Sequence, residues 1–437
     1  MSSNKSNTLQ GKWQQILSDV VIEAEALVQS SQRQRKLSVE QLVQTLVIGC
    51  LEGEKVSLRL WSEVAADLGC EISASSLDER LTGRVVMLLH EVLQSSIRRQ
   101  VDVSRLPVPR LQQFSRMILY DSTAITLPPI LKHTFRAGRQ TGVGHMKVQV
   151  GYDYLNAQLQ CVSVHEGIEP DQHDGGLLAQ AVPDALLIFD LGYFDQHDLK
   201  CITEQGAYFV TRYQSQTGLY DLQTGVAIVL LQQLQQTTGD WFEATYRLGR
   251  EAQSKTRIVA RRVSVATAAE HRRQVKRRAQ ADGYTPSQRS LALCDWEIII
   301  TNLPDDWTAQ QVLDLYRVRW QIELIFKAWK SDLDLTHFGY WRRERVLCQL
   351  YATLIGAVLC HCTFATVRFT THEASLFKAV RLIRRHISTL LPIIRRNWWG
   401  IGAWIERLRQ ALLKFAQQQN LETAPSSLRR LINWGLS

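Results

Sequence analysis

The sequence predicts an α/β protein in which a mixed sheet is preceded and followed by helical regions. Residues 9–105 and 338–437 carry apolar side chains at the spacing of amphipathic helices, whereas residues 116–213 hold short apolar runs typical of strands. The length of 437 residues is enough for two or three domains. With 45% hydrophobic and 21% charged residues, the composition is that of an ordinary globular protein.

The first hundred residues predict helices. GKWQQILSDVVIEAEALV and SVEQLVQTLVIGCLEG both have helical apolar spacing, and Ser38 is placed to cap the second with Glu40 in its first turn. A third helical stretch runs from SASSLDER to SSIRRQV. The proline-containing segment SRLPVPR, residues 104–110, then marks a boundary, so we expect a helical region over residues 1–105.

A central region over residues 111–337 is expected to contain the sheet. Its strand candidates are residues 116–122, 146–154, 159–167, 184–192, 207–213 and 296–304. The second and third of these runs are joined by a short segment around Asn156, so we expect them to form an antiparallel pair with a turn there. The first and fourth are apolar runs that end in Asp121 and Asp190. Residues 213–294 are polar and basic with short strand-like pieces, and we interpret them as a β-rich insertion.

A long helix over residues 308–333 follows the last strand. At about 100° per residue, its apolar side chains share an arc of about 100°, the width of a core-facing stripe. A second arc of roughly 80° holds Tyr316, Arg319, Glu323, Lys327 and Lys330. This second arc is either a solvated face with a Glu323–Lys327 pair or a functional surface.

The positive charge of the chain is concentrated late in the sequence. The formal net charge is +9, which favours a polyanionic partner. Residues 246–290 hold twelve Lys and Arg against three acidic residues, and residues 337–437 hold fifteen against four.

Cysteine usage and the apolar segments fit a reducing compartment without a membrane partner. The eight cysteines are scattered, and the one cluster, Cys360-His361-Cys362, is expected to pack within a helix. The polar N-terminus MSSNKSNTLQ lacks the apolar stretch of a signal peptide. The uncharged segment from Cys348 to Val367 is long enough to span a bilayer, but we expect a helix buried inside a domain.

Three carboxylates combine into a site hypothesis. Asp121 and Asp190 each follow an apolar strand, where ligands collect in α/β sheets, and Glu323 lies on the helix that follows. Either aspartate alone could simply close a turn. Three converging carboxylates would repel one another and therefore need cations such as Mg²⁺. A pair of ions about 3.5–4 Å apart promotes in-line phosphoryl displacement, and Arg319, Lys327 and Lys330 would then bind phosphates.

The pattern Tyr316-x2-Arg319-x3-Glu323-x6-Lys330 resembles the Tyr-Arg-Glu-Lys signature of the "family four" insertion-sequence DDE transposases. These are bacterial cut-and-paste enzymes with a ribonuclease H-like core. Asp121 in YDSTAITLP is similar to the first catalytic aspartate of that family, and Asp190 in IFDLGYFD to the second. The resemblance covers roughly residues 116–330. It implies a catalytic and metal-binding set of Asp121, Asp190 and Glu323, with two Mg²⁺ ions for which Mn²⁺ can substitute.

The resemblance also implies how the enzyme acts and what it contacts. An enzyme of this family is expected to bind the terminal inverted repeats of its element, nick at the 3′ end, form a hairpin and join the 3′ ends to target DNA. Expected DNA contacts are Arg212, Trp296, Tyr316, Arg319, Lys327 and Lys330. The family places a tryptophan beside the insertion's return strand, where it can stack on a displaced base, and Trp296 lies one residue from that register.

By analogy, residues 1–105 are expected to bind the DNA ends, and residues 338–437 to support homodimerisation and further DNA contact. Localisation is expected to be cytoplasmic and nucleoid-associated. Two alternatives remain at the level of sequence. One is a ribonuclease H-like nuclease without strand transfer, and the other is a catalytically dead DNA-binding protein derived from a transposase. The intact three carboxylates argue against the second.

Overall fold

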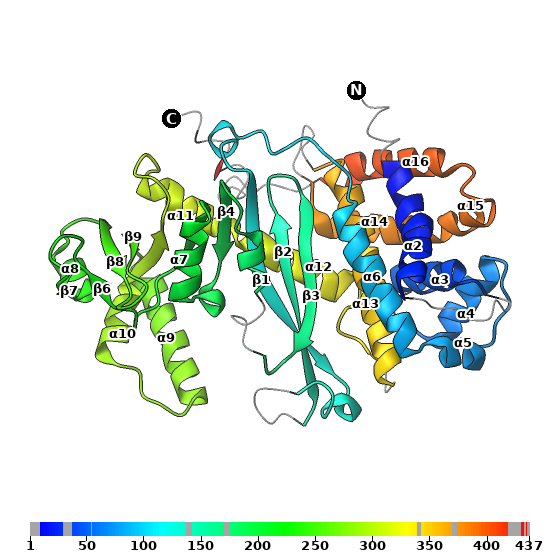
Figure 1. The fold of residues 1–437 in the computed structure, drawn as a ribbon, viewed down its shortest axis with the longest axis horizontal. Coiled ribbons are helices and arrows are strands. Elements are labelled where there is room, and N and C mark those ends of the chain that lie inside the picture. Colours follow the sequence, from blue (N-terminus) through cyan, green and yellow to red (C-terminus); the bar gives the residue numbers. More distant parts are fainter. Residues whose placement is uncertain are drawn as a thin grey trace. The chain divides into compact units, whose positions relative to one another are not determined.

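The computed structural model describes residues 9–28, 37–53, 55–136, 142–169, 175–338, 342–368, 374–417, 430–431 and 434 (Figure 1). The chain divides into two compact units. The helical unit comprises Met1–Leu106, Ser122–Glu169 and Gln321–Leu421. The sheet unit comprises Pro107–Asp121, Pro170–Trp320 and Glu422–Ser437. The chain therefore passes between the units directly after Asp121 and directly after Trp320.

The sheet unit is built on parallel strands whose central residues are buried. Strand β1 (Arg116–Leu127) pairs in parallel with β4 (Ala185–Phe189), which pairs in parallel with β5 (Tyr208–Arg212). Strand β10 (Trp296–Thr301) then pairs antiparallel with β5. All five residues of β4, ALLIF, are buried, as expected of a parallel strand covered on both faces. Helix α7 (Gln196–Glu204) connects β4 to β5.

The other strands extend this core in both directions. In the helical unit, β2 (Gly144–Asp153) and β3 (Gln158–Glu166) form an antiparallel hairpin, and the strand order there is β3-β2-β1. In the sheet unit the order is β1-β4-β5-β10-β9-β8-β6-β7. Strand β1, an antiparallel hairpin and two strands that continue the parallel pairing of β1 follow one another along the chain in the order of a ribonuclease H-like core. The predicted mixed α/β fold is confirmed.

The apolar run predicted a strand that ends at Asp121, but β1 continues beyond it. It continues to Leu127, and only Arg116–Tyr120 pair with β4. After Asp121 the burial alternates, with Thr123, Ile125 and Leu127 buried and the residues between them more exposed. This period of two is typical of a half-exposed strand. The apolar run in the sequence therefore ends where the parallel pairing ends, although the strand itself continues.

The predicted helix over residues 308–333 is two helices, α11 (Ala309–Val318) and α12 (Trp320–Asp332). They meet at Arg319, whose backbone N–H donates to the carbonyl of Tyr316, three residues back, in the tighter pattern that marks helix ends. The expected apolar stripe is nevertheless buried: Val318, Ile322, Ile325, Phe326 and Trp329. The stripe packs on both sides of the break, so apolar spacing alone gave no signal for it.

The insertion contains helices in addition to the expected strands. Its strands are β6 (Leu219–Tyr220), β7 (Ala227–Ile228), β8 (Trp241–Leu248) and β9 (Ser254–Arg262), and its helices are α8 (Leu230–Gln236), α9 (Val265–Ala281) and α10 (Gln288–Ala292). The most basic stretch forms α9, because Ala, Arg, Lys and Gln are strong helix formers and Ser264 caps the first turn.

The helical unit combines helices from both ends of the chain. The first hundred residues supply η1 (Gln15–Asp19), α2 (Val20–Val28), α3 (Val39–Glu52), α4 (Leu58–Asp67), α5 (Ala74–Arg80) and α6 (Gly83–Arg98). The C-terminal part supplies α13 (Arg343–Ala365), α14 (Leu376–Ile387), α15 (Leu391–Arg395) and α16 (Ile401–Phe415). Residues 418–429 of the predicted C-terminal region lie outside the described residues. Ser38 caps α3 as predicted, within a capping box with Gln41.

One tryptophan shows how the two ends share a core. Trp13 is fully buried and donates its indole N–H to Thr363 Oγ1 of α13 at 3.0 Å. Its ring also meets that of Trp404 on α16 edge-on, at 5.3 Å between centroids. The N-terminal and C-terminal helices of this unit therefore fold together.

Helix α13 is the apolar segment that the sequence analysis singled out. It is long and apolar enough to cross a membrane, but 94% of its apolar window is buried within the structure, as expected of a core helix. His361 accepts a hydrogen bond from Trp329 Nε1 at 3.3 Å, and burial lowers the pKa of this imidazole to about 3. The neighbouring Cys360 and Cys362 are buried free thiols, so this cluster packs within a helix as predicted.

Candidate active site

The parallel pairing of β1 and β4 brings two of the predicted carboxylates to the same edge of the sheet. Tyr120 and Phe189 are partners in the register, and Asp121 and Asp190 are the residues that follow them. Adjacent strands lie about 4.8 Å apart. Asp190 also stands at the N-cap of the short 3₁₀ helix η6 (Leu191–Tyr193). This is the position at which α/β sheets collect ligands.

The C-terminal end of α11 supplies two polar groups to these carboxylates. Tyr316 Oη donates to Asp190 Oδ1 at 3.0 Å, and Arg319 Nη1 donates to Asp121 Oδ2 at 2.8 Å. Arg212, the last residue of β5, has its guanidinium carbon 5.5 Å from the centre of the Tyr316 ring, and that of Arg319 is 5.8 Å from it. We call these five residues the aspartate–arginine cluster.

Burial distinguishes this cluster from a solvated helix face. Tyr316 is 4% exposed and Arg319 is 9% exposed. The alternative of a simply hydrated surface is therefore wrong for both residues. Guanidinium groups are seldom buried this far without carboxylate partners, and Arg319 has one in Asp121. Arg212, by contrast, is exposed.

The surroundings of Asp190 favour its ionised form. Burial raises the pKa of this carboxyl, but the backbone N–H of Leu191, the charges of Arg319 and Arg212 and the Tyr316 hydroxyl together hold it below its ordinary value. Burial also raises the pKa of Tyr316, so this phenol keeps its proton and remains a donor. The site therefore presents an anionic oxygen that is already stabilised by positive charge.

The remaining residues of the predicted signature lie on α12, which belongs to the helical unit. Glu323 is in its first turn and is half-buried. Lys327 is exposed, with its ammonium 5.8 Å from the centre of the Phe377 ring, and burial lowers the pKa of the half-buried Lys330. Among the described residues, no group of three or more His, Cys, Asp and Glu side chains is gathered tightly enough to hold a metal ion.

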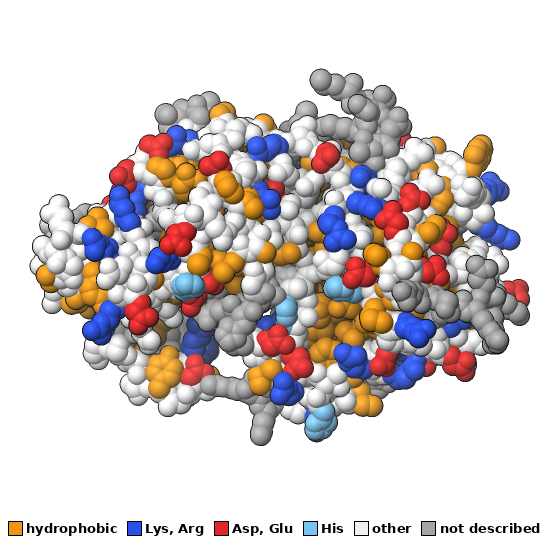
Figure 2. All heavy atoms as spheres, viewed as in Figure 1, with side chains coloured by type: hydrophobic (Ala, Val, Ile, Leu, Met, Phe, Trp, Pro, Cys, Tyr) orange, Lys and Arg blue, Asp and Glu red, His pale blue; other side chains and the backbone are white. Residues whose placement is uncertain are grey.

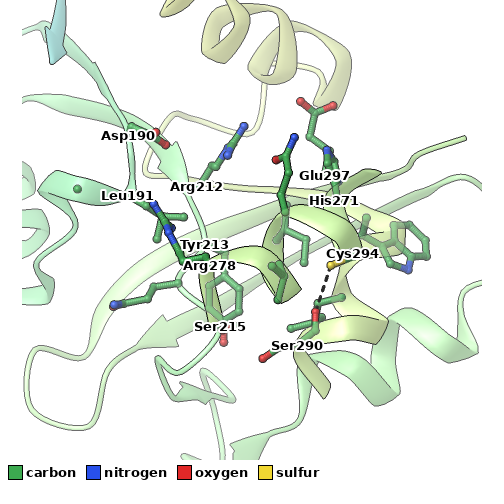
Figure 3. A pocket seen from close by; sticks show the side chains of 17 residues that line it. Asp190, Leu191, Arg212, Tyr213, Ser215, His271, Arg278, Ser290, Cys294 and Glu297 are labelled. Atoms are coloured by element: carbon green, nitrogen blue, oxygen red, sulfur yellow. Dashed lines mark hydrogen bonds between the residues drawn. The ribbon is translucent and has the colours of Figure 1, made fainter. Parts of the chain in front are cut away.

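A cleft of about 790 Å³ opens beside Asp190 within the sheet unit (Figure 3). Asp190 and Arg212 line it from the strand ends. Helix α9 lines it with one face, since its four contributing residues are His271, Gln274, Val275 and Arg278. A spacing of three and four residues places side chains on the same side of a helix. The insertion thus forms one wall of a polar cleft that reaches the candidate site.

The two tryptophans of the insertion region differ in exposure. Trp296 lines the cleft but is only 7% exposed, with the Arg262 guanidinium 4.5 Å from its ring centre. Trp241, on β8, is 38% exposed, with the Arg261 guanidinium 6.0 Å from its ring. From the sequence we expected Trp296, or failing that another aromatic residue of the insertion, to stack on a base, and Trp241 is such a residue.

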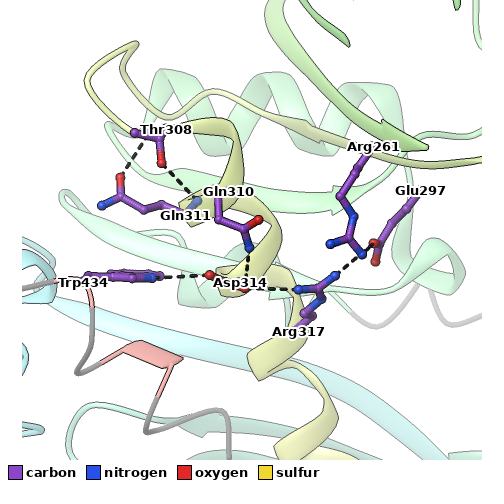
Figure 4. A network of polar contacts seen from close by, with 8 residues as sticks. All are labelled: Arg261, Glu297, Thr308, Gln310, Gln311, Asp314, Arg317 and Trp434. Atoms are coloured by element: carbon purple, nitrogen blue, oxygen red, sulfur yellow. Dashed lines mark hydrogen bonds and ion pairs between the residues drawn. The ribbon is translucent and has the colours of Figure 1, made fainter. Parts of the chain in front are cut away.

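A network of polar contacts fixes α11 against the sheet (Figure 4). Asp314 accepts hydrogen bonds from Gln310 at 2.9 Å, Arg317 at 3.2 Å and the indole N–H of Trp434 at 3.4 Å. Arg317 also pairs with Glu297 of β10 at 3.4 Å, as does Arg261 of β9. No sequence pattern predicts this network, because it joins segments more than a hundred residues apart. It holds the helix that carries Tyr316 and Arg319.

Comparison with known proteins shows the family of the chain. The family model described as a transposase DDE domain matches residues 112–359, more than half of the chain. The chain is 28% identical over 371 residues to the transposase for insertion sequence element IS231F of Bacillus thuringiensis subsp. israelensis, covering 78% of this chain and 77% of that protein. It is 26% identical over 333 residues to the transposase for IS1151 of Clostridium perfringens, covering 70% and 68%.

A solved structure of the piggyBac transposase, in a synaptic complex with hairpin DNA, is also similar. It has a TM-score of 0.42 and 11% identity, over 96% of this chain and 82% of that one. A TM-score this low establishes no shared fold, so the fold rests on the strand arrangement described above. The family assignment rests on the matched domain. The chain belongs to the family of transposases with a DDE domain, and it is an enzyme of metal-dependent DNA cleavage and strand transfer.

Proposed function

We propose that this chain is the transposase of a bacterial insertion sequence, in which Asp121, Asp190 and Glu323 are the catalytic carboxylates. It binds the terminal inverted repeats of its element, nicks the DNA at their 3′ ends and joins the freed 3′ ends to target DNA. The observation that carries the proposal is the aspartate–arginine cluster. Two carboxylates at neighbouring parallel strand ends lie beside two guanidinium groups in the sheet unit, and the pKa of Asp190 is held below its ordinary value.

The donor atoms fit a hard divalent cation. Asp121 and Asp190 offer carboxylate oxygens, and the environment of Asp190 already favours negative charge. Asp121, Asp190 and Glu323 would hold one or two Mg²⁺ ions, with Mn²⁺ as a substitute. Two metal ions, when bound, would act as Lewis acids that stabilise the attacking and leaving oxygens. Tyr316 orients Asp190 for that role through its hydroxyl.

The arginines of the cluster are the proposed phosphate ligands. Arg212 is exposed at the end of β5 and lines the cleft, so its guanidinium is accessible to a DNA backbone. Arg319 presents a planar fork that can grip a phosphate at two points, which a lysine cannot do. Lys327 and Lys330 would add phosphate contacts from α12. These roles follow from charge and position.

We propose that excision passes through hairpin ends, and that an insertion tryptophan stacks on the base displaced when the hairpin forms. Such a contact is worth about 1–3 kcal/mol. Trp296 lines the cleft, but its burial and its contact with Arg262 leave it little free ring surface. Trp241 is the more accessible of the two. The basic side chains of α9 in and beside the cleft would contact the phosphates of the DNA strand.

The remaining assignments rest on the family. Residues 1–105 would recognise the end sequences, and residues 338–437 would support homodimerisation and further DNA contact. The enzyme would act on double-stranded DNA in the bacterial cytoplasm, on the nucleoid.

The test is to incubate the protein with Mg²⁺ and a plasmid that carries its gene together with the flanking DNA. We expect an excised element with hairpin ends on a denaturing gel, followed by joined products when target DNA is added. A nuclease without transfer would cut the plasmid and yield no joined product. A catalytically dead derivative would bind the plasmid and leave it intact.

A further inference from the structure

The contact between Arg319 and Asp121 places a fixed positive charge on a carboxylate that the proposed mechanism needs for metal. Arg319 Nη1 lies 2.8 Å from Asp121 Oδ2, and both side chains are largely withdrawn from water. Arg319 is held there at the junction of α11 and α12, where its own backbone N–H is bonded to Tyr316. The Arg319–Asp121 ion pair is therefore held in place inside the sheet unit.

The charges of the aspartate–arginine cluster balance without any ion. Asp121 and Asp190 contribute two negative charges, and Arg212 and Arg319 contribute two positive charges. A divalent cation that bound Asp121 and Asp190 would leave the cluster with an excess of two positive charges. Like charges in a partly buried site repel strongly, and an occupied carboxylate oxygen is a poorer ligand.

We propose that Arg319 is a counter-ion which occupies Asp121 in the DNA-free protein and is transferred to a DNA phosphate when substrate binds, so that metal binding is coupled to DNA binding. The inference rests on the proposed role of Asp121 as a metal ligand. A phosphate removes one positive charge from Asp121 and supplies a new partner to the guanidinium. The freed Asp121 oxygen then accepts the cation. The protein without DNA thus holds metal weakly and is protected from cutting at random sites.

Two features make Arg319 the residue that moves rather than Arg212. Arg212 is exposed and its guanidinium lies over the face of the Tyr316 ring, and within the described part of the chain no hydrogen bond joins it to an aspartate oxygen. Arg319 bonds directly to a carboxylate oxygen and also lies within reach of the same ring, which offers its guanidinium a second resting place. Because coupling of two binding events is reciprocal, metal should strengthen DNA binding by the same factor.

The experiment measures Mn²⁺ binding by electron paramagnetic resonance, without reference to activity. For the DNA-free protein we expect Arg319→Gln to bind Mn²⁺ about tenfold more tightly than wild type, within the usual range for coupled sites. Arg317→Gln is the matched control. It removes the same charge two residues away, from a side chain paired with Asp314 and Glu297, so it controls both for general charge and for any loosening of α11, and should leave Mn²⁺ affinity unchanged.

A second measurement uses the wild-type protein alone. A duplex containing an end of the element should tighten Mn²⁺ binding about tenfold, after subtraction of the Mn²⁺ held by that duplex itself. The same duplex should have little further effect on Arg319→Gln. Arg319→Lys keeps the charge and should bind Mn²⁺ as weakly as wild type when DNA is absent.

Asp121→Asn separates this inference from the proposed function. If Asp121→Asn leaves the Mn²⁺ affinity of the DNA complex unchanged, Asp121 is not a metal ligand and both ideas fail. If Asp121→Asn weakens Mn²⁺ binding in the DNA complex but Arg319→Gln does not tighten it in the DNA-free protein and DNA does not tighten it in wild type, the counter-ion role alone is overturned. Equal tightening by Arg319→Gln and Arg317→Gln would also overturn it, since general charge would then explain the effect.

Discussion

Arg319 is the residue in which the chemistry of the site is most concentrated. It pairs with one aspartate, lowers the pKa of the other and lies against the Tyr316 ring. A guanidinium serves all three contacts because it is planar, always charged and able to donate in several directions. An ammonium group at the same position keeps only the charge.

We therefore expect Arg319→Lys to fold, to bind DNA ends and to lose about 10²-fold in the rate of strand transfer, since a misplacement of about 1 Å can cost that much. Single-turnover assays on pre-nicked ends would measure it, with Arg317→Lys as the matched control. Strand transfer at the wild-type rate would remove Arg319 from the reacting phosphate and leave it a purely structural partner of Asp121.

His361 makes a prediction about acid stability. Its folded pKa of about 3 lies below the ordinary value of 6.5, so the unfolded chain binds a proton that the folded helical unit does not. Its contribution to stability is therefore complete above pH 6.5 and is lost as the pH falls from 6.5 toward 3. Between pH 7 and 4.5 the loss is roughly 2.5 kcal/mol.

His361→Gln keeps an acceptor for the Trp329 indole and removes the titration. Its unfolding midpoint in urea should fall less between pH 7 and 4.5 than that of wild type. His133→Gln makes the same chemical change at an exposed position of the same unit and should behave like wild type. A wild-type dependence on pH in His361→Gln would show that other groups control acid unfolding.

Among the helices and strands, those with regular apolar spacing were predicted from the sequence. The buried runs of β1, β4, β5 and β10, and the stripe across α11 and α12, were all visible as patterns. The extension of β1 past Asp121 was missed because its apolar and polar residues alternate too weakly to identify a strand from the sequence alone. The break at Arg319 was missed because the buried stripe continues across it.

The contacts of the site could be predicted only in part. The signature and the strand ends placed Asp121, Asp190, Tyr316 and Arg319 on the right elements. Their pairing joins residues 126 and 198 positions apart in the chain, and such pairs depend on sheet order and helix docking. The roles of Glu323, Lys327, Lys330, Arg212 and Trp296 in catalysis and DNA binding stay predictions.

Helix α11 is positioned by its first turn. Thr308 accepts from the Gln311 N–H at 3.2 Å, and the Gln311 side chain accepts from the Thr308 N–H at 3.0 Å (Figure 4). Loss of an N-cap hydroxyl costs about 1 kcal/mol. Thr308→Ala should therefore raise the native-state hydrogen-exchange rate of the α11 amides about fivefold, whereas Thr308→Ser should not. Equal exchange in the two variants would mean that the polar network around Asp314 alone fixes this helix.

For the whole molecule, charge is distributed unevenly along the chain but less so on the surface. Figure 2 shows basic and acidic side chains interspersed over the described residues of one face. The concentration of positive charge that stands out is on α9, where Arg273, Lys276 and Arg277 are exposed. DNA binding is therefore expected to depend on local basic surfaces of the folded protein in addition to its net charge of +9.

End binding should weaken steeply with salt, because each neutralised phosphate releases counterions and contributes about −0.9 to the slope of log affinity against log salt. The double variant Lys276→Gln, Arg277→Gln should flatten that slope by about 2. Lys200→Gln, on α7 and paired with Glu204, is the matched control and should leave the slope unchanged. A wild-type slope flatter than about −2 between about 50 and 200 mM salt would contradict an extended basic interface.

Asp121, Asp190 and Glu323 are the proposed ligands of the metal for DNA cleavage. The most direct test is Mg²⁺-dependent nicking of a plasmid that carries the gene and its flanks, compared across Asp121→Asn, Asp190→Asn and Glu323→Gln. Asp305→Asn and Glu204→Gln, both at exposed positions, serve as matched controls. We expect each of the three variants to abolish nicking while binding the ends like wild type when divalent cations are absent, and both controls to cut normally. Retained nicking by any one of the three variants would contradict the claim for that residue.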